Sequence, residues 1–258
     1  MFTALVVGCA VAGLVVGSFL NVVVYRVPRG ESVVRPGSHC PACAAPIGAL
    51  DNVPVVSWLV LRGRCRHCGA RISARYLLVE VATAALFAGV AARLGATAVL
   101  PAELAAVATL VALSVIDVER LVLPKRVVYP GLALTGLLLV GAAVHDHAGG
   151  RLGEAVACAG AWFALFFVLN LAAPRALGFG DVRLAPLLGA SLGWLGWRYA
   201  VVGFFGANLV GAVVGIALIA SGRMSRRQPI PYGVFLAIGT VGTILAGPAA
   251  VSWTTGIR

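Results

Sequence analysis

The feature that most constrains this chain is a series of long apolar runs that carry almost no charge. Hydrophobic residues make up 60% of its 258 positions, and the mean hydropathy is +0.99. A helix needs about 20 such residues to cross a bilayer, and helices satisfy their own backbone hydrogen bonds in lipid. We therefore predict an all-α, multi-pass membrane protein with about eight transmembrane helices. The predicted spans are 2–25, 76–94, 102–116, 127–144, 154–173, 182–197, 199–220 and 232–253.

The basic charge of the chain is best explained by its orientation in the membrane. The net charge is +11, with 20 lysine and arginine residues. Most of them fall in segments that share one side of the membrane if the polar stretch 26–75 is cytoplasmic, as the positive-inside rule requires. We predict a cytoplasmic (inner) membrane protein with both termini outside and the lipid bilayer as a partner. This distribution gives no support for nucleic-acid binding, and the sequence predicts no oligomeric state.

The polar stretch 26–75 contains two Cys-x-x-Cys pairs at a separation typical of paired zinc knuckles. The stretch is too small to fold on an apolar core alone, and four thiolates bind zinc tetrahedrally. Disulfides or free thiols are the alternatives, but a cytoplasmic location disfavours disulfides. We predict a structural zinc site formed by Cys40, Cys43, Cys65 and Cys68, with the flanking His39 and His67 outside the ligand set. Cys9 and Cys158, in apolar runs, are predicted to be ordinary buried thiols.

Two acids stand at the ends of apolar runs. Asp181 follows Gly-Phe-Gly at 178–180, and Asp117 ends the predicted span 102–116. An ionised carboxylate is costly in apolar surroundings, and two carboxylates brought together are the catalytic parts of an aspartic protease. The predicted topology puts both acids at the cytoplasmic face. We expect 178–181 to be a flexible loop that presents a carboxylate; the alternative is a turn in which Asp181 only caps the next helix.

These features suggest four segments along the chain. Residues 1–25 form a first transmembrane helix, and 26–75 form a cytoplasmic zinc-binding insert resembling a zinc ribbon. Residues 76–100 form a second transmembrane helix with an outer loop, and 101–258 form a helical bundle that carries both acids. For two other polar residues near the insert, the sequence allows two interpretations each. Asn21 either makes an interhelical hydrogen bond or lines a site, and Glu80 either forms an ion pair or acts on a substrate.

The ordered set of motifs resembles the bacterial type IV prepilin leader peptidase/N-methyltransferase family, which are membrane aspartic proteases of the Gly-x-Gly-Asp type. The resemblance extends over about residues 16–236. It rests on Gly-Ser-Phe-Leu-Asn at 17–21, Ser-His-Cys-Pro-Ala-Cys at 38–43, Asp-Asn-Val-Pro at 51–54, Gly-Arg-Cys-Arg-His-Cys at 63–68, Ile-Ser-Ala-Arg-Tyr at 72–76 with Glu80, Asp117 before Leu-Pro at 123–124, and Gly-Phe-Gly-Asp at 178–181.

The resemblance implies that Asp117 and Asp181 cleave the leaders of prepilins and pseudopilins, and that the new N-terminal residue is methylated with S-adenosylmethionine. Val53, Arg183, Tyr232 and Val234 depart from the usual family residues without touching the acids or the cysteines. No glycine-rich loop of the dinucleotide-binding type marks a cofactor site, so the residues that bind the methyl donor stay unknown. The alternatives are a protease-only enzyme with a structural zinc module and a proton-coupled transporter, although a transporter is expected to show internal repeats.

Overall fold

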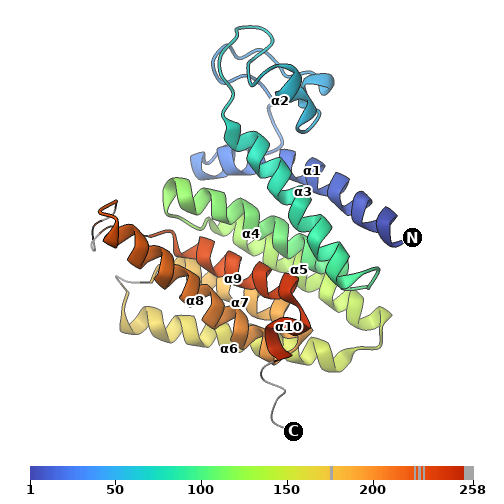
Figure 1. Cartoon of the computed structure of the whole chain (residues 1–258), viewed down its shortest axis with the longest axis vertical. Helices are drawn as coiled ribbons and strands as arrows, with labels where there is room; N and C mark the ends of the chain where they lie inside the picture. The colour runs from blue at the N-terminus through green and yellow to red at the C-terminus, as the bar shows by residue number, and fades with distance from the viewer. Residues whose placement is uncertain (175–176, 224, 226–227, 229, 253–258) are drawn as a thin grey trace. The chain divides into compact units, whose positions relative to one another are not determined.

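The computed structural model describes residues 1–174, 177–223, 225, 228 and 230–252. Helices dominate these residues, and the β-pairing found among them is limited to two isolated bridges. The chain divides into two compact units, Met1–Gly95 and Ala96–Arg258. Figure 1 shows the helical elements of each unit. The predicted all-α class is confirmed.

The first unit consists of two long helices with an irregular insert between them. Its elements are α1 (Phe2–Arg26), η1 (Val27–Arg29), η2 (Ala49–Asn52), α2 (Val56–Val60) and α3 (Ala74–Leu94). α1 and α3 are in backbone contact, because a Cβ added to Gly13 would lie 2.6 Å from the Cα of Ala84, and one added to Gly17 would lie 2.8 Å from the Cα of Glu80. Small residues permit this close approach in membrane helices.

One buried arginine fixes the start of the insert. Arg26, at the end of α1, donates hydrogen bonds to the carbonyl oxygens of Ser32 and Pro36 at 3.1 and 2.7 Å, and to that of Gly37 at 3.0 Å. A buried guanidinium needs such partners to offset the loss of its hydration. Its role in folding the insert was not predicted, because the sequence suggested only a charge beside the membrane.

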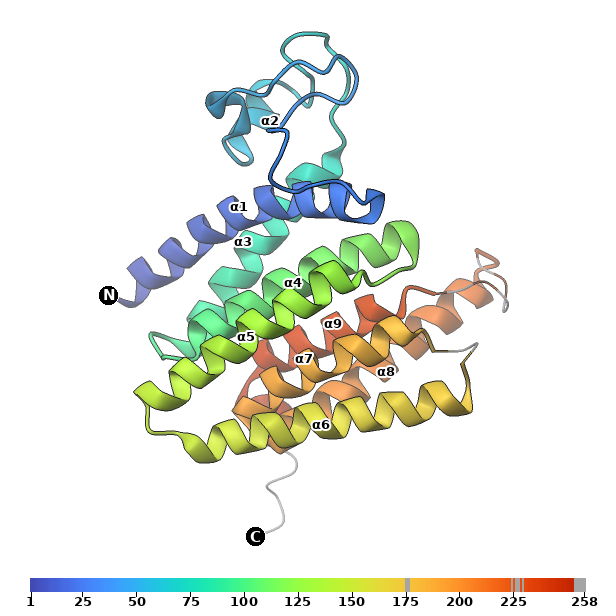
Figure 2. The ribbon, with the colours of Figure 1, turned by 180° about the vertical axis from the view of Figure 1, so that it is seen from behind.

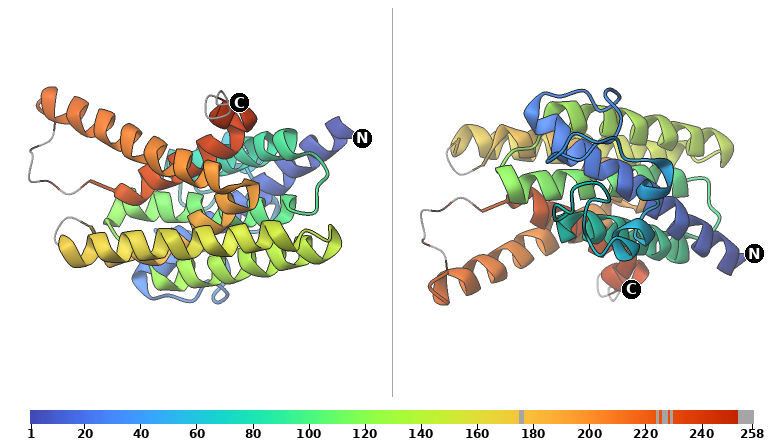
Figure 3. Two further views of the ribbon diagram at one scale, coloured as in Figure 1. Left: turned by 90° about the horizontal axis from the view of Figure 1, so that it is seen from below. Right: turned by 90° about the horizontal axis from the view of Figure 1, so that it is seen from above.

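The second unit is a bundle built around a buried central helix. Its elements are α4 (Leu100–Arg120), α5 (Lys125–His145), α6 (Gly149–Ala172), α7 (Phe179–Leu195), α8 (Trp197–Ala220), α9 (Tyr232–Ala246) and α10 (Pro248–Val251). α7 lies among α5, α6, α8 and α9 (Figure 2), and its side chains at Leu184, Leu187 and Leu188 are completely buried. α8 diverges from α6 (Figure 3).

Six helices are long and apolar enough to cross a membrane, among the described residues. They are α1, α3, α4, α5, α6 and α8. The two other predicted spans correspond to α7 and α9, which have only 17 and 15 residues. Burial within the bundle explains why helices shorter than the usual span remain apolar. The predicted end of the last span at position 253 lies outside the described residues.

The contact between α6 and α7 gives a first testable prediction. A Cβ on Gly189 of α7 would lie 2.5 Å from the carbonyl oxygen of Cys158 on α6, so the two backbones must separate to accept even alanine. We expect Gly189→Ala to lower the unfolding free energy by about 1–3 kcal/mol, as overpacking does. Thermal unfolding in detergent measures this effect. Gly136→Ala on α5 is the matched control, because its Cβ would meet open space; equal stability of the two variants would contradict the predicted contact.

Candidate active site and metal centre

The two predicted acids lie at the ends of two helices in the second unit. Asp117 is in the last turn of α4, and Asp181 is in the first turn of α7. Their side chains are 6% and 8% exposed, and they are close enough for their charges to interact. The expectation of a flexible loop at 178–181 is wrong, since α7 begins at Phe179, before the predicted start at 182. The N-cap residue of α7 is Gly178, and no side-chain hydrogen bond caps this helix. Asp181 lies inside the first turn and is not the N-cap residue.

Close approach explains the glycines around the acids. A Cβ on Gly180 would lie 3.0 Å from the Cβ of Leu123. One on Gly233, in the first turn of α9, would lie 3.0 Å from Asp117 Oδ2 and 3.1 Å from Leu123 Cδ2. The first turns of α7 and α9 therefore meet at Leu123, in the segment after α4, and α9 also reaches the Asp117 carboxyl group. A Cβ at either glycine would press on these neighbours.

The acids retain capacity to bind a reacting group. The Oδ2 atom of Asp117 is buried beside Gly233, at the start of α9, and has no hydrogen-bond partner among the described residues. Arg183 lies over the ring of Phe179, 4.7 Å from the ring centre. A pair of neighbouring carboxylates can share one proton, so that one takes a proton from water while the other donates to a carbonyl oxygen.

The structure also shows a third buried acid that sequence reasoning missed. Glu103 of α4 is completely buried and accepts a hydrogen bond from the Ser191 hydroxyl of α7. These are the same two helices that carry Asp117 and Asp181. The signal was available, since Glu103 interrupts the apolar run that ends at Asp117. This buried hydrogen bond joins α4 to α7 far along both helices from the ends that carry Asp117 and Asp181.

This link predicts a graded response to substitution. Glu103→Gln keeps an acceptor oxygen for Ser191 and should leave stability and catalysis nearly unchanged. Glu103→Leu leaves the Ser191 hydroxyl without its partner, which costs about 1–3 kcal/mol for a buried polar group. Unfolding measurements on both variants, with Ser191→Ala in the Glu103→Leu background, test the link. If the second change restores none of the lost stability, the lost hydrogen bond is not the cause.

The four predicted cysteines of the first unit converge. Their sulfur atoms all lie within 4.8 Å of one another, and Cys40 Sγ is 3.9 Å from Cys68 Sγ. Four sulfurs at about 2.3 Å from a zinc ion would be roughly 3.8 Å apart. The cluster thus has the size and donor set of a tetrahedral site with four thiolate ligands.

The two Cys-x-x-Cys segments fold in the same way. In the first, the N–H of Cys40 donates to Ala45 O and the N–H of Ala44 donates to Cys40 O, both at 2.9 Å. The second repeats both bonds, from Cys65 to Ala70 and from Gly69 to Cys65, again at 2.9 Å. Each segment is closed by one β-bridge, His39 with Pro46 and Arg64 with Arg71. The spacing of the cysteines predicts a pair of zinc knuckles. In the structure the two segments form knuckles with the same backbone hydrogen bonds.

The knuckle backbone favours the thiolates that a metal requires. The N–H groups of Cys43 and Ala42 lower the pKa of Cys40 to about 7. The N–H groups of Cys68 and His67 likewise lower the pKa of Cys65. In the absence of a metal ion, hydrogen bonds with the neighbouring thiols, with Cys43 first, and burial raise the pKa of Cys68 to about 11. Thiolates, not thiols, ligate metals. The chemistry of the donor set therefore fits zinc.

The two residues left open by the sequence lie beside this cluster. The Nδ2 group of Asn21 donates a hydrogen bond to Tyr76 O at 3.0 Å and so joins α1 to α3. The Oε2 atom of Glu80 accepts one from the Val55 N–H at 2.7 Å. Both side chains also line a cavity of the first unit. The interhelical hydrogen bond is therefore present at Asn21, and its role in a site stays a prediction.

A helical bundle with a pair of buried carboxylates has the catalytic parts of a membrane aspartic peptidase. Two family models match the chain: the bacterial peptidase A24 N-terminal domain over residues 11–94 and the type IV leader peptidase family over residues 104–216. With the relatives described below, they show that the chain belongs to the type IV leader peptidase family.

Curated relatives match over most of the chain. A protein of Aeromonas hydrophila is 37% identical, covering 93% of this chain and 90% of the relative. One of Burkholderia pseudomallei (strain 1026b) is 36% identical, covering 92% and 84%. One of Myxococcus xanthus (strain DK1622) is 40% identical, covering 84% and 64%. Each bears the name prepilin leader peptidase/N-methyltransferase. No solved structure matches this chain.

Proposed function

We propose that this protein is a bifunctional enzyme of the inner membrane that cleaves the leaders of prepilins and pseudopilins and methylates the new N-terminal residue. The observation that carries the proposal is the convergence of Asp117 and Asp181 in the bundle of the second unit. Family membership and the names of the relatives support both activities. A proton-coupled transporter is not favoured, because the relatives are peptidases by name.

Cleavage is assigned to the two aspartates. Either carboxylate takes a proton from a water molecule, and the water oxygen attacks the scissile carbonyl carbon. The other carboxyl group donates its proton to the carbonyl oxygen. The first carboxyl group then passes the proton taken from water to the leaving nitrogen as the C–N bond breaks, and a hydroxyl proton of the tetrahedral intermediate returns to the second carboxylate. The buried site excludes bulk water, which strengthens the interaction of these charges with the developing transition state.

We assign a structural role to the cysteine cluster. Cys40, Cys43, Cys65 and Cys68 would hold a zinc ion, and the ion would supply folding free energy to an insert that has few buried apolar side chains. S-adenosylmethionine is the methyl donor implied by the relatives' names. The insert, the catalytic acids and the positively charged loops are assigned to the cytoplasmic side, with both termini outside.

One reaction tests this function. Purified protein in detergent is incubated with a full-length prepilin and a labelled methyl donor, and the product masses are measured. We expect loss of the leader and the addition of one methyl group to the new N-terminus. An intact prepilin after prolonged incubation with folded, zinc-loaded protein would contradict the proposed peptidase. A cleaved but unmethylated product would instead favour the protease-only alternative.

A further inference from the structure

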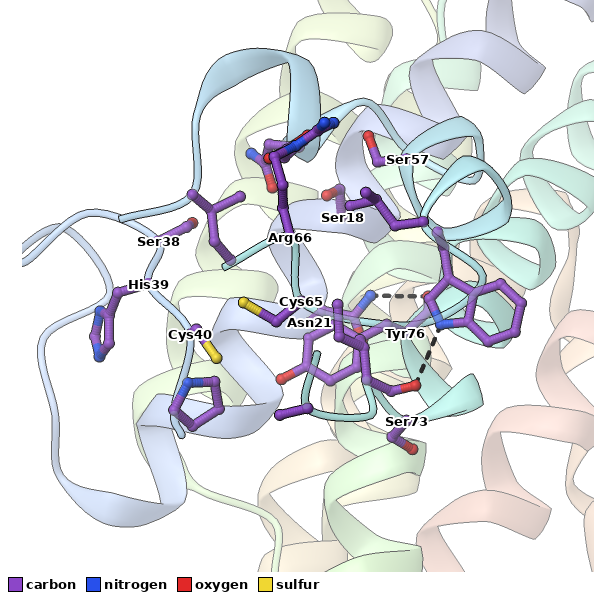
Figure 4. Close-up of a pocket in the computed structure, with 18 of the residues that line it drawn as sticks. Ser18, Asn21, Ser38, His39, Cys40, Ser57, Cys65, Arg66, Ser73 and Tyr76 are labelled. Atoms are coloured by element: carbon purple, nitrogen blue, oxygen red, sulfur yellow. Dashed lines mark hydrogen bonds and ion pairs between the residues drawn. The ribbon is translucent and has the colours of Figure 1, made fainter. Parts of the chain in front are cut away.

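The first unit contains a cavity of about 380 Å³ that lies apart from the proposed catalytic aspartates in the chain. It lies among α1, the insert and the start of α3, and Figure 4 shows part of its lining. Its size is that of a pocket for a small organic ligand. We propose, resting on the methyl transfer above, that this cavity binds the sulfonium methyl donor and the substrate amine, and that Glu80 accepts the proton of the amine.

The first observation is an unsatisfied polar atom. Asn21 is 2% exposed, and its Nδ2 donor is occupied by Tyr76 O (Figure 4). Its Oδ1 atom has no hydrogen-bond partner among the described residues. A buried amide oxygen without a partner destabilises the fold, so the cavity offers an acceptor for an N–H or O–H group of a ligand. An amine or an amino-acid ammonium group has the complementary donors.

The second observation is a carboxylate fixed beside that acceptor. Glu80 is 7% exposed, and its orientation is set by the 2.7 Å hydrogen bond from the Val55 N–H. The helices that carry Glu80 and Asn21 touch through Gly17, whose added Cβ would lie 2.8 Å from the Glu80 Cα. The cavity therefore holds a carboxyl group and a neutral acceptor on adjoining helices, which suits a ligand that carries N–H donor groups.

Aromatic rings complete a lining suited to a sulfonium nucleoside. Tyr25, Trp58 and Tyr76 all line the cavity. Two of these rings already hold cations: Arg29 lies 3.8 Å from the Tyr25 ring centre, and Arg75 lies 4.8 Å from that of Tyr76. Aromatic faces attract cationic groups and stack on planar bases. The indole of Trp58 is fixed by Gly63, where an added Cβ would lie 2.8 Å from the ring.

The proposed step transfers a methyl group and moves one proton. Glu80 takes a proton from the substrate ammonium and leaves a lone pair on nitrogen. The nitrogen attacks the methyl carbon, a C–N bond forms, and the C–S bond breaks with its electron pair remaining on sulfur. The sulfonium becomes a neutral thioether, and the product is a methylated ammonium. Charge and atoms balance, and no further reactant is required.

Glu80→Gln tests the proton acceptor. Gln retains an oxygen for the Val55 N–H, so the insert should keep its fold. An α-amino group has a pKa near 8, so about one tenth of it is neutral near pH 7. We expect the variant's methylation rate on a pre-cleaved peptide to fall roughly tenfold near pH 7 and to recover as the pH rises above about 8. A structural defect would not be relieved by raising the pH. Glu31→Gln, at an exposed position of the insert, is the matched control and should follow the wild type.

Asn21→Leu tests donor binding without relying on activity. We measure binding of S-adenosylmethionine to the full-length, zinc-loaded protein by calorimetry and expect at least a tenfold loss of affinity in the variant. Cleavage of an intact prepilin should remain within about twofold of wild type in both variants, which would show that the second unit is intact.

The outcomes separate failure of this inference from failure of the proposed function. Wild-type protein that binds no methyl donor and methylates no peptide would contradict this inference and the methyltransferase part of the proposed function, but not the peptidase. Wild-type methylation with unchanged rates and affinities in the Glu80 and Asn21 variants would overturn the cavity assignment alone. A raised KM for prepilin cleavage in Glu80→Gln, with methylation unchanged, would also overturn it and would assign the cavity to leader recognition.

Discussion

Asn at either position 117 or position 181 should reduce prepilin cleavage by at least about a thousandfold while the protein stays folded. The amide matches the carboxylate in shape but cannot accept and return a proton. Both acids are buried and close enough for their charges to interact, so each is required for a shared proton. Initial rates with a prepilin peptide, together with helicity and thermal unfolding of each variant, measure the effect.

The control for this prediction is an acid outside the site. Asp146 lies just after α5, is exposed, and its Oδ1 is 2.8 Å from His145 Nδ1. Asp146→Asn should cleave at the wild-type rate. A well-folded Asp181→Asn protein that still cleaves prepilin would remove Asp181 from the catalytic pair.

Replacing Cys65 and Cys68 with Ser should abolish methylation and weaken cleavage. Metal binding contributes on the order of 10 kcal/mol to the folding of small zinc-binding peptides. The insert's second knuckle would lose both of its sulfur donors. Cys40 and Cys65 also line the proposed donor cavity, so unfolding of the knuckles would open it. The helices should remain inserted, because their burial in lipid does not depend on the metal.

Metal content, helicity and both activities are measured on this double variant, with pre-cleaved peptide supplied for the methylation assay. Cys9→Ser is the matched control, since Cys9 lies in α1 away from the cluster residues in sequence and should change neither zinc content nor activity. Full methylation by a zinc-free Cys65→Ser, Cys68→Ser protein would reject the role of the insert.

The parts of the structure that the sequence predicts are those set by local patterns. The spacing of the two Cys-x-x-Cys pairs predicts the cluster, because each pair forms its own knuckle from neighbouring residues. Hydropathy predicts the long helices, because a segment in lipid must be apolar along its length. The aspartates at the ends of apolar runs predict an acidic pair once the topology places both at one membrane face.

The parts that the sequence does not predict depend on contacts between distant residues. Hydropathy predicts the helices α7 and α9, but it does not predict that α7 begins at Phe179 or that most of its side chains are buried within the bundle. The bond between Ser191 and Glu103 joins helices far apart in the chain. Likewise, the carbonyl cradle of Arg26 depends on the path of a loop without regular structure. The division into four segments and the sidedness of the membrane stay predictions.

The most direct test of the two-site assignment is a single variant assayed with two substrates. Asp181→Asn protein, loaded with zinc and supplied with S-adenosylmethionine, is given an intact prepilin in one reaction and a pre-cleaved peptide in another, and the product masses are measured. We predict that the prepilin keeps its leader while the pre-cleaved peptide gains one methyl group, because we assign the two reactions to different residues in different units. Cleavage of the prepilin by this variant, or loss of methylation in a protein that still folds and binds the donor, would contradict the assignment.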